Sequence, residues 1–571
     1  MPLKQNVPFK AITGGQALLF PPSLDDLVQE NHPVRLVSSV VDRLNIDPIL
    51  ESYKGGGSSS FHPRIMIKVL FYSYLNNIYS CRKIAAALEE NVHFMWISGN
   101  SRPDFRTINL FRSSRLKGHI QTLFAEVIRL MSEMGYVSLD IQFVDGTKIE
   151  SVANRYTFVW RKSVEKRKEV LENKIRVVLS QIEQSINKDS SEPEENLIPD
   201  KINKQELDNK IKEINKRLQG DKNAPKELKK QVKELEKSSE KLDSYQQDLE
   251  KMGDRNSYSK TDEDATFMRM KDDHLGTGQL RPGYNVQISS ENQIVTCFSV
   301  HQNAGDSTTL PIHLQQFETL YGKAGKTLVA DAGYGSEENY MLLETKGMEA
   351  YVKYNTFFRE QKSAHKQNPF HPDNLYYNPE ADFYVCPMGQ HMYNVGSHRR
   401  SSTTGFKSHI DVYEAINCNG CPLRSGCFKA AGNRSIDRNN NLIRLKKQAK
   451  ELLDSQQGKQ YRLRRNIEPE SVFGQLKSNN RFSRFRMIGI PKIEIDLGLA
   501  IIGHNLRKMM AKICPEFRFS GPKRSLSAQA ESLCFFLNLT ISTLWKLVRK
   551  SSCQITFQLQ FLNSEPRYTV M

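Results

Sequence analysis

Alternating hydrophobic and polar positions predict a set of short strands in the middle of the chain. Stretches of this kind lie at residues 136–148, 284–289 and 294–300. A short apolar run at 327–331 predicts a buried strand that stops at Asp331, and a further strand is predicted at 350–354. A short polar turn joins the second stretch to the third, which predicts an antiparallel hairpin. Helices are expected between the later stretches, and Asp306 is expected to cap the first of them. This order predicts one mixed α/β sheet with a large insertion after its first strand.

The first 130 residues have a different pattern, with hydrophobic positions three and four residues apart. Ile65 and Val69 follow this spacing, and two further helices are expected downstream. Basic residues stand in or near the first turns of those helices, at Arg82, Lys83 and Arg106. This arrangement suits an all-α DNA-binding domain of the helix-turn-helix type. A helical bundle with charged outer faces is the alternative that the sequence leaves open.

The large insertion, residues 156–260, is rich in lysine and glutamate and carries hydrophobic residues at heptad-like steps. Ile175, Leu179 and Ile182 are examples of this spacing. Prolines and a glycine divide the segment into about three helices. We therefore expect a helical or coiled-coil hairpin with a structural role.

A second insertion, residues 356–460, has no clear periodicity and is predicted to be irregular. It contains a group of four cysteines: Cys386, Cys418, Cys421 and Cys427. Nine cysteines in 571 residues are too few for a disulfide scaffold. A CxxC pair in a loop-rich segment suits a structural zinc site, because four thiolates can complete a tetrahedron. Reduced thiols without a metal are the alternative.

The charge of the chain points to a polyanionic partner. Lysine and arginine total 81 against 64 aspartate and glutamate residues, so the net charge is +17 and the isoelectric point is about 9.3. Nucleic acid is the commonest partner of so basic a protein. The chain has no run of 18 apolar residues and no signal-peptide pattern at its start, so we expect a cytoplasmic protein without a membrane partner.

Three acidic residues are candidates for catalysis. Asp145 and Asp331 are expected at strand ends, and Glu470 lies in the first turn of a late helix. Three carboxylates that converge on one point repel each other unless cations neutralise them, and divalent metals with oxygen ligands are the expected occupants. Two Mg²⁺ ions would activate a hydroxyl nucleophile and stabilise the leaving oxygen in a phosphoryl displacement.

These segments resemble the DDE transposases of bacterial insertion sequences. The matching stretches are Val144–Lys148, Val329–Tyr334 and Glu470–Lys477, with further similarity at Phe61–Arg64, Ile78–Lys83 and Pro103–Thr107. The resemblance covers roughly residues 15–510. It implies an RNase-H-like catalytic core, Mg²⁺ dependence, and cleavage and strand transfer of double-stranded DNA at element ends. It also implies that Lys477 and Arg464 contact DNA.

The resemblance suggests a division of the chain. Its parts are an N-terminal domain (1–130), a first core segment (131–355), the cysteine-containing insertion (356–460), the final core helices (461–515) and a C-terminal tail without an assigned role (516–571). The resemblance implies a nucleoid-associated bacterial protein that acts on element ends and target DNA as a homodimer or larger assembly.

The sequence permits two registers for the third acid. The family pattern is Tyr, two residues, Arg, three residues, Glu, six residues, Lys. Tyr461, Arg464 and Glu468 satisfy its first half, whereas Glu470 and Lys477 satisfy its second half. We favour Glu470, because it lies on the same helix face as Lys477. Glu468, directly before a proline, is expected at the helix cap.

Two other functions remain open at this stage. The protein could be a catalytically inactive remnant that still binds DNA, or an RNase-H-like nuclease that hydrolyses DNA without joining it. The presence of all three acids argues against the remnant.

Overall fold

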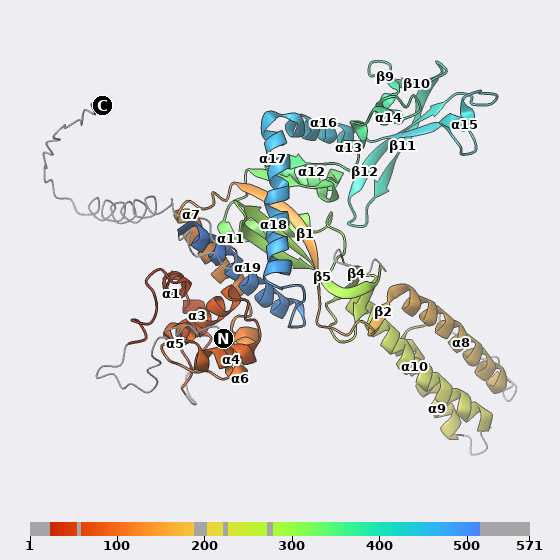
Figure 1. Ribbon diagram of the computed structural model, residues 1–571. Helices are drawn as coiled ribbons and strands as arrows, with labels where there is room; N and C mark the ends of the chain where they lie inside the picture. The colour runs from red at the N-terminus through yellow and green to blue at the C-terminus, as the bar shows by residue number, and fades with distance from the viewer. Residues whose placement is uncertain (1–22, 54–58, 188–201, 221–225, 271–277, 514–571) are drawn as a thin grey trace, which may run out of the picture. The chain divides into compact units, whose positions relative to one another are not determined.

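A computed structural model describes residues 23–53, 59–187, 202–220, 226–270 and 278–513 (Figure 1). The C-terminal tail expected at 516–571 lies outside the described residues. Contacts between residues divide the chain into a unit that spans Met1–Arg507 and a second that spans Lys508–Met571. The contacts discussed below all lie in the first unit.

The central sheet has the mixed topology that the sequence predicts. Its six strands are β1 (Ile141–Glu150), β4 (Thr266–Arg269), β5 (Leu280–Glu291), β6 (Ile294–His301), β7 (Thr327–Ala330) and β8 (Glu349–Val352). The order is β4-β5-β1-β7-β8, with β6 paired to β5. On one side of β1 lies the antiparallel β5–β6 hairpin, and on the other lie the parallel strands β7 and β8. This arrangement is consistent with an RNase-H-like core, so the predicted fold class is confirmed.

Helices from distant parts of the sequence cover this sheet. They are α11 (Leu310–Tyr321), α12 (Glu337–Thr345), α16 (Asn440–Asp454), α17 (Gln456–Ile467) and α18 (Pro469–Gly474). Phe143 and Tyr351 from the strands share one buried cluster with Leu445 and Tyr461 from α16 and α17. Each large apolar side chain buried in this way contributes about 1.5–3 kcal/mol. The packing holds α18 against β1 and β5 (Figure 1).

The first strand differs from the sequence prediction at its end. Asp145 was expected where the strand stops, but β1 continues to Glu150. The reason is that β5 pairs with β1 as far as Glu150, opposite Gly283. The parallel partner β7 pairs only with Ile141–Phe143. Asp145 is therefore inside β1 but just beyond the end of its neighbour β7.

The N-terminal region is all-α, as predicted. Its elements are α1 (Pro33–Arg43), α2 (Asp47–Glu51), α3 (Pro63–Leu75), α4 (Cys81–Glu90), α5 (Val92–Ile97), α6 (Phe105–Leu110), the π-helix η1 (Phe111–Arg115) and α7 (Ile120–Glu133). The Tyr74 hydroxyl donates a hydrogen bond to Asp496 of α19 (Ile490–Ile513) at 2.6 Å. Long-range contacts of this kind fasten the helical region to the end of the core.

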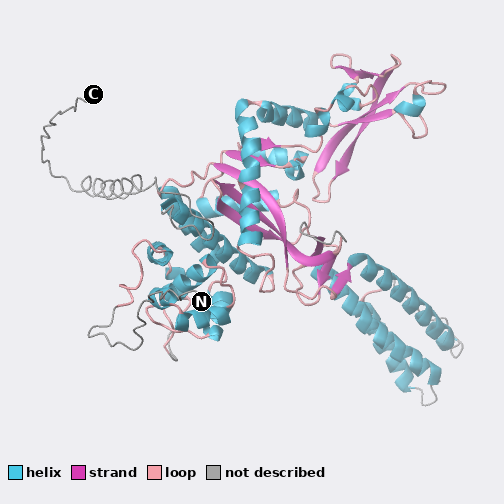
Figure 2. Ribbon diagram, viewed as in Figure 1, coloured by secondary structure: helices cyan, strands magenta, loops and turns pink. Residues whose placement is uncertain are grey.

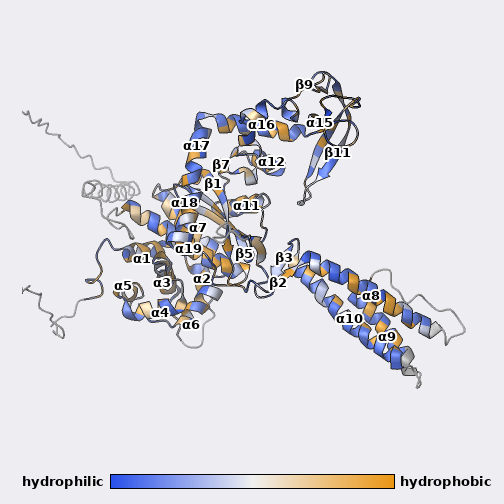
Figure 3. Cartoon of the chain, turned by 45° about the vertical axis from the view of Figure 1, so that its right-hand side comes forward, coloured by the Kyte–Doolittle hydropathy of each residue, from blue (hydrophilic) through white to orange (hydrophobic). Residues whose placement is uncertain are grey.

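The large insertion is a set of three helices on a short two-stranded sheet. The helices are α8 (Arg161–Asn187), α9 (Lys204–Gly220) and α10 (Lys226–Met252), and β2 (Phe158–Trp160) pairs with β3 (Ser257–Ser259) at their base. The heptad residues, among them Ile175 and Leu179, form a separate buried cluster. Orange hydrophobic positions alternate with blue hydrophilic ones along these helices in Figure 3. The helical insertion expected from the heptads is present.

The second insertion is more regular than the sequence indicated. It contains the five-stranded antiparallel sheet β9 (Tyr376–Asn378), β10 (Phe383–Val385), β11 (His391–Ser401), β12 (Lys407–Ala415) and β13 (Ser435–Arg438), with the short elements α13 (Phe357–Glu360), α14 (Ser363–Lys366), η3 (Pro372–Asn374) and α15 (Arg424–Cys427) (Figure 2). The prediction of an irregular segment was wrong. Most of β11 is exposed on both faces, so its residues show no two-residue hydrophobic period.

Candidate active site

The register of the parallel strands brings two of the predicted acids together. Ile141 pairs with Thr327 and Phe143 pairs with Val329. Continuing the same register by two residues places Asp145 level with Asp331, which follows directly after β7. Both side chains therefore stand at the end of β7, where a catalytic group in a sheet of this kind is held rigidly.

Small residues beside the two aspartates leave room for polar groups. A Cβ atom on Gly146 would lie 2.3 Å from Nε2 of Gln287 and 2.8 Å from Oδ1 of Asp306, closer than atoms can pack. The N–H of Gly333 donates a hydrogen bond to Oδ1 of Asp331 at 2.8 Å. These glycines thus let amide and carboxylate groups approach the strand ends closely.

One arginine contacts all three predicted acids. Nη2 of Arg465 lies 3.4 Å from Oδ1 of Asp145 and 3.3 Å from Oδ2 of Asp331. Its Nη1 lies 3.7 Å from Oε1 of Glu470. The Arg465 side chain is only 8% exposed, and its Nε has no hydrogen-bond partner among the described residues. One guanidinium therefore balances part of the charge of three converging carboxylates.

The two candidate glutamates have different surroundings. The Glu468 side chain is 5% exposed, and its Oε1 lies 2.8 Å from Nη2 of Arg464. Its Oε2 accepts a hydrogen bond from the N–H of Gln293 at 2.6 Å. The Glu470 side chain is 54% exposed and faces Arg465. Glu468 is the N-cap residue of α18 but makes no side-chain cap hydrogen bond.

Asp306 is a fourth acid near this site, and the prediction that it caps a helix was wrong. Helix α11 begins at Leu310 with Thr309 at its N-cap. The Asp306 carboxylate instead accepts hydrogen bonds from Nδ2 of Asn285 at 2.8 Å and Nε2 of Gln287 at 3.0 Å. The strand periodicity of Asn285 and Gln287, two polar residues on one face of a buried strand, is the signal that could have indicated this network.

A buried tyrosine completes the network behind the acids. The Tyr334 hydroxyl donates a hydrogen bond to Oε1 of Gln287. Burial raises the pKa of Tyr334 well above its usual value, and the nearby carboxylates, Asp306 foremost, add to the rise. The phenol therefore stays protonated and acts as a donor.

The basic residues predicted to contact DNA lie in two places. Arg464 pairs with Glu468 and lies over the ring of Phe143, 5.2 Å from its centroid. Lys477 is half-buried in the π-helix η4 (Gln475–Asn479). The α-helical spacing from Glu470 thus ends at Gly474, before Lys477. The shared helix face on which the choice of Glu470 was based is therefore interrupted, and the contacts of Arg464 and Lys477 with DNA stay predictions.

The N-terminal basic residues gather around one exposed ring. The guanidinium groups of Arg82 and Arg106 both lie over Phe105, at 5.3 and 5.7 Å from its centroid. These residues line a cavity of about 760 Å³ between α4, α6 and Arg486. Lys83 is exposed next to Arg82. An exposed aromatic ring with two flanking arginines is suited to nucleic acid.

The four cysteines predicted to bind zinc line one cavity of about 340 Å³. Nη1 of Arg434 lies 2.8 Å from the sulfur of Cys427, and its backbone N–H donates to Cys418. Within the part of the chain that the structure describes, no three of these sulfur atoms lie within 4.8 Å of one another. The structure gathers the thiols, and their binding of zinc stays a prediction.

Two family models match the chain. One is described as a transposase DDE domain and matches residues 385–510, which include Arg465 and Glu470. The other is described as a transposase domain (DUF772) and matches residues 22–114. The comparisons with curated proteins and with solved structures gave no match. None of the described helices has the length and hydropathy needed to cross a membrane.

Proposed function

Because the chain belongs to the insertion-sequence DDE transposases, we propose that it binds the ends of its element and catalyses metal-dependent DNA cleavage and strand transfer. In this proposal it acts on double-stranded DNA in the bacterial cytoplasm, at the nucleoid, as a homodimer or larger assembly. The observation that carries the proposal is the convergence of Asp145, Asp331 and Glu470 on one guanidinium. A structural ion pair would need one carboxylate for this guanidinium, whereas the site has three.

The donor set suits a hard divalent cation. Asp145, Asp331 and Glu470 supply only carboxylate oxygens, the ligands that Mg²⁺ prefers. Asp331 and Glu470 are 41% and 54% exposed, so solvent and substrate reach them, whereas Asp145 is 10% exposed. When bound, Mg²⁺ would activate a hydroxyl and stabilise charge on the phosphate oxygens. The one buried guanidinium leaves the net charge of the site negative, which favours cation binding.

The surrounding residues position these acids. Gln287 joins the Tyr334 hydroxyl to the Asp306 carboxylate. This buried network supports the strand ends that carry Asp145 and Asp331. Arg465 restrains all three acids. The pKa of Lys353 is lowered, chiefly by burial and next by the nearby charge of Arg465. In this proposal Lys353, which is half-buried, would contact a DNA phosphate beside the carboxylates.

DNA binding is proposed for the N-terminal helices. Arg82, Lys83 and Arg106 are exposed around Phe105, and this surface would hold the element ends while the core acts on them. The proposal separates binding from chemistry, because these residues lie on α4 and α6 and the acids lie on the sheet and α18.

The test is to incubate purified protein with DNA that carries its own element ends, with Mg²⁺ or with a chelator, and to map the products. Cleavage at the ends followed by joining to target DNA supports the proposal. A protein that binds the ends but never cuts them is the inactive remnant. A protein that cuts without joining is a nuclease. A matched control is Asp331→Asn, which keeps the side-chain shape and removes the charge.

A further inference from the structure

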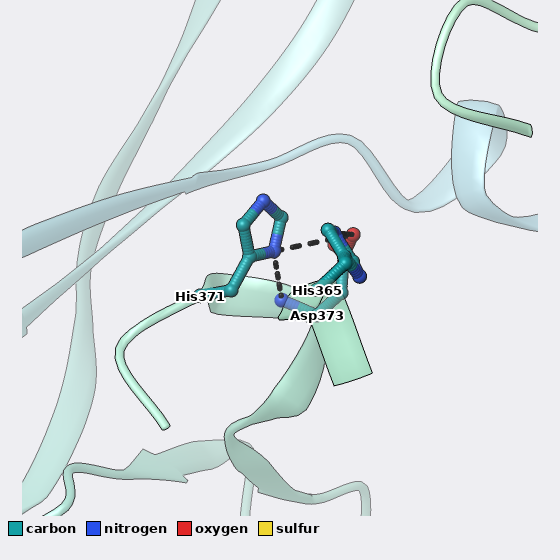
Figure 4. Close-up of side chains that lie close together, drawn as sticks. All are labelled: His365, His371 and Asp373. Carbon is teal, nitrogen blue, oxygen red and sulfur yellow. Dashed lines mark hydrogen bonds and ion pairs between the residues drawn. The ribbon is translucent and has the colours of Figure 1, made fainter. Parts of the chain in front are cut away.

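Two histidines and an aspartate form a compact group outside the catalytic core. His365 lies in α14, and His371 and Asp373 lie at the start of η3. Nε2 of His365 is 3.7 Å and Nδ1 of His371 is 3.4 Å from the same carboxylate oxygen, Oδ2 of Asp373. One ligand atom from each residue lies within 4.8 Å of the others. Figure 4 shows the His371 ring directed at the Asp373 carboxylate.

His365 is the unusual member of the group. Its side chain is 8% exposed, and its Nε2 is buried without a hydrogen-bond partner among the residues that the structure describes. A buried ring nitrogen of this kind is unfavourable unless something binds it. The nitrogen is directed at the Asp373 carboxylate but lies too far away for a hydrogen bond.

Helix capping explains only part of the arrangement. Nδ1 of His371 accepts a hydrogen bond from the N–H of Asp373 at 3.3 Å. His62 and His32 also precede a proline and accept from the residue two positions on, at 3.2 Å in both cases. Capping therefore accounts for His371. It gives no role to the buried Nε2 of His365 or to the Asp373 carboxylate.

We propose that His365, His371 and Asp373 bind a divalent transition-metal ion of the Zn²⁺ class. The ligand atoms are Nε2 of His365, Nδ1 of His371 and Oδ2 of Asp373, and water takes a fourth position. Because Nδ1 of His371 has a single lone pair, the metal would replace its long hydrogen bond from the Asp373 N–H. Two ligands of a tetrahedral zinc ion lie roughly 3.3 Å apart, given metal–ligand distances of about 2.0–2.1 Å. The separations of 3.4 and 3.7 Å are close to that value.

The chemistry of the ligands separates this site from the other two metal sites considered above. Imidazole nitrogens suit zinc and its neighbours, whereas the three core acids offer only oxygen and the cysteines only sulfur. The bound ion would tie α14 to η3, in the segment that leads from β8 to the second sheet.

The test uses the full-length chain, stripped of metal with a chelator and titrated with Co²⁺ alone and then with Zn²⁺. Asp373→Asn is the first variant, because the Asp373 side chain is 56% exposed and its loss should leave the fold intact. His365→Asn is the second variant. His62→Asn is the matched control, since it removes an equivalent helix-capping histidine.

We expect Asp373→Asn and His365→Asn each to weaken one Co²⁺ site at least about tenfold and to remove its visible absorption. His62→Asn should bind as the unmodified chain does. Subtracting the spectrum of each variant from that of the unmodified chain removes the signal of ions held by the core acids or the cysteines. The result therefore does not depend on whether the chain has the proposed transposase activity. Equal metal content and spectra in the unmodified chain and in both variants would overturn the proposal.

Discussion

Arg464 and Glu468 form an ion pair one helical turn apart, with 2.8 Å between Nη2 and Oε1. The next residue along, Arg465, instead faces Glu470 and the two aspartates. The two candidate glutamates therefore pair with two adjacent arginines: Glu468 with Arg464, and Glu470 with Arg465. In the first pair Glu468 is buried and Arg464 is partly exposed, whereas the second pair lies beside the strand ends.

We predict that Glu470→Gln eliminates DNA cleavage, because the amide keeps the shape but removes a carboxylate ligand. Glu468→Gln should leave cleavage measurable and lower the free energy of unfolding by about 1–3 kcal/mol, since it removes a charge-assisted hydrogen bond to Arg464. Cleavage assays and denaturant unfolding of both variants check this. An inactive Glu468→Gln protein beside an active Glu470→Gln protein would assign the site to the other register.

Substitution of either aspartate should stop DNA cleavage without weakening DNA binding. We expect Asp145→Asn and Asp331→Asn to abolish strand cleavage while the affinity for element ends changes little, because the basic residues on α4 and α6 remain. A gel-shift titration and a cleavage assay on the same DNA measure both quantities. Cleavage by either variant would remove that residue from the proposed site.

Much of the core follows from local patterns in the sequence. The hydrophobic run that ends at Asp331 predicts β7, and the two stretches around a polar turn predict the β5–β6 hairpin. The parallel register that brings Asp145 level with Asp331 is not a local property. It depends on the pairing of strands far apart in the chain, which periodicity alone cannot supply.

Other features escaped the sequence because they depend on side-chain direction. Arg464 and Arg465 are adjacent and chemically identical, yet successive helical residues point about 100° apart. Only the phase of α17 on the sheet decides that Arg465 meets the acids. Asp306 was assigned to a helix cap from its sequence context, but the amides of Asn285 and Gln287 hold its carboxylate near the site.

DNA binding should depend on the cluster around Phe105. We predict that Arg82→Ala combined with Arg106→Ala weakens binding and reduces the slope of log affinity against log salt by about 1–2, as expected when one or two phosphate contacts are lost. Lys229→Ala combined with Lys233→Ala removes the same charge from exposed positions on α10 and serves as the control. Equal effects in the two double variants would show that only net charge matters.

Arg465 should stabilise the protein without metal and compete with metal. In Arg465→Gln, three carboxylates lose their shared guanidinium. Removing one partner of a buried ion pair costs about 3–5 kcal/mol, but Asp331 and Glu470 are partly exposed, so we expect about 1–3 kcal/mol in the presence of a chelator. Adding Asp145→Asn to this variant should recover part of that loss, because it removes one of the repelling charges.

Mg²⁺ should then raise the melting temperature of Arg465→Gln more than that of the unmodified protein, because no side-chain cation has to be displaced from the acids. Thermal unfolding over a Mg²⁺ titration measures the difference. Arg462→Gln is the matched control: this arginine lies on the same helix, 4.0 Å from Asp454 and over the ring of Phe357, and it forms no ion pair with the three acids among the described residues. If Mg²⁺ shifted the Arg465→Gln, Arg462→Gln and unmodified proteins equally, the guanidinium would not occupy the place where the metal binds. Arg465 would then be an ordinary structural partner of the acids.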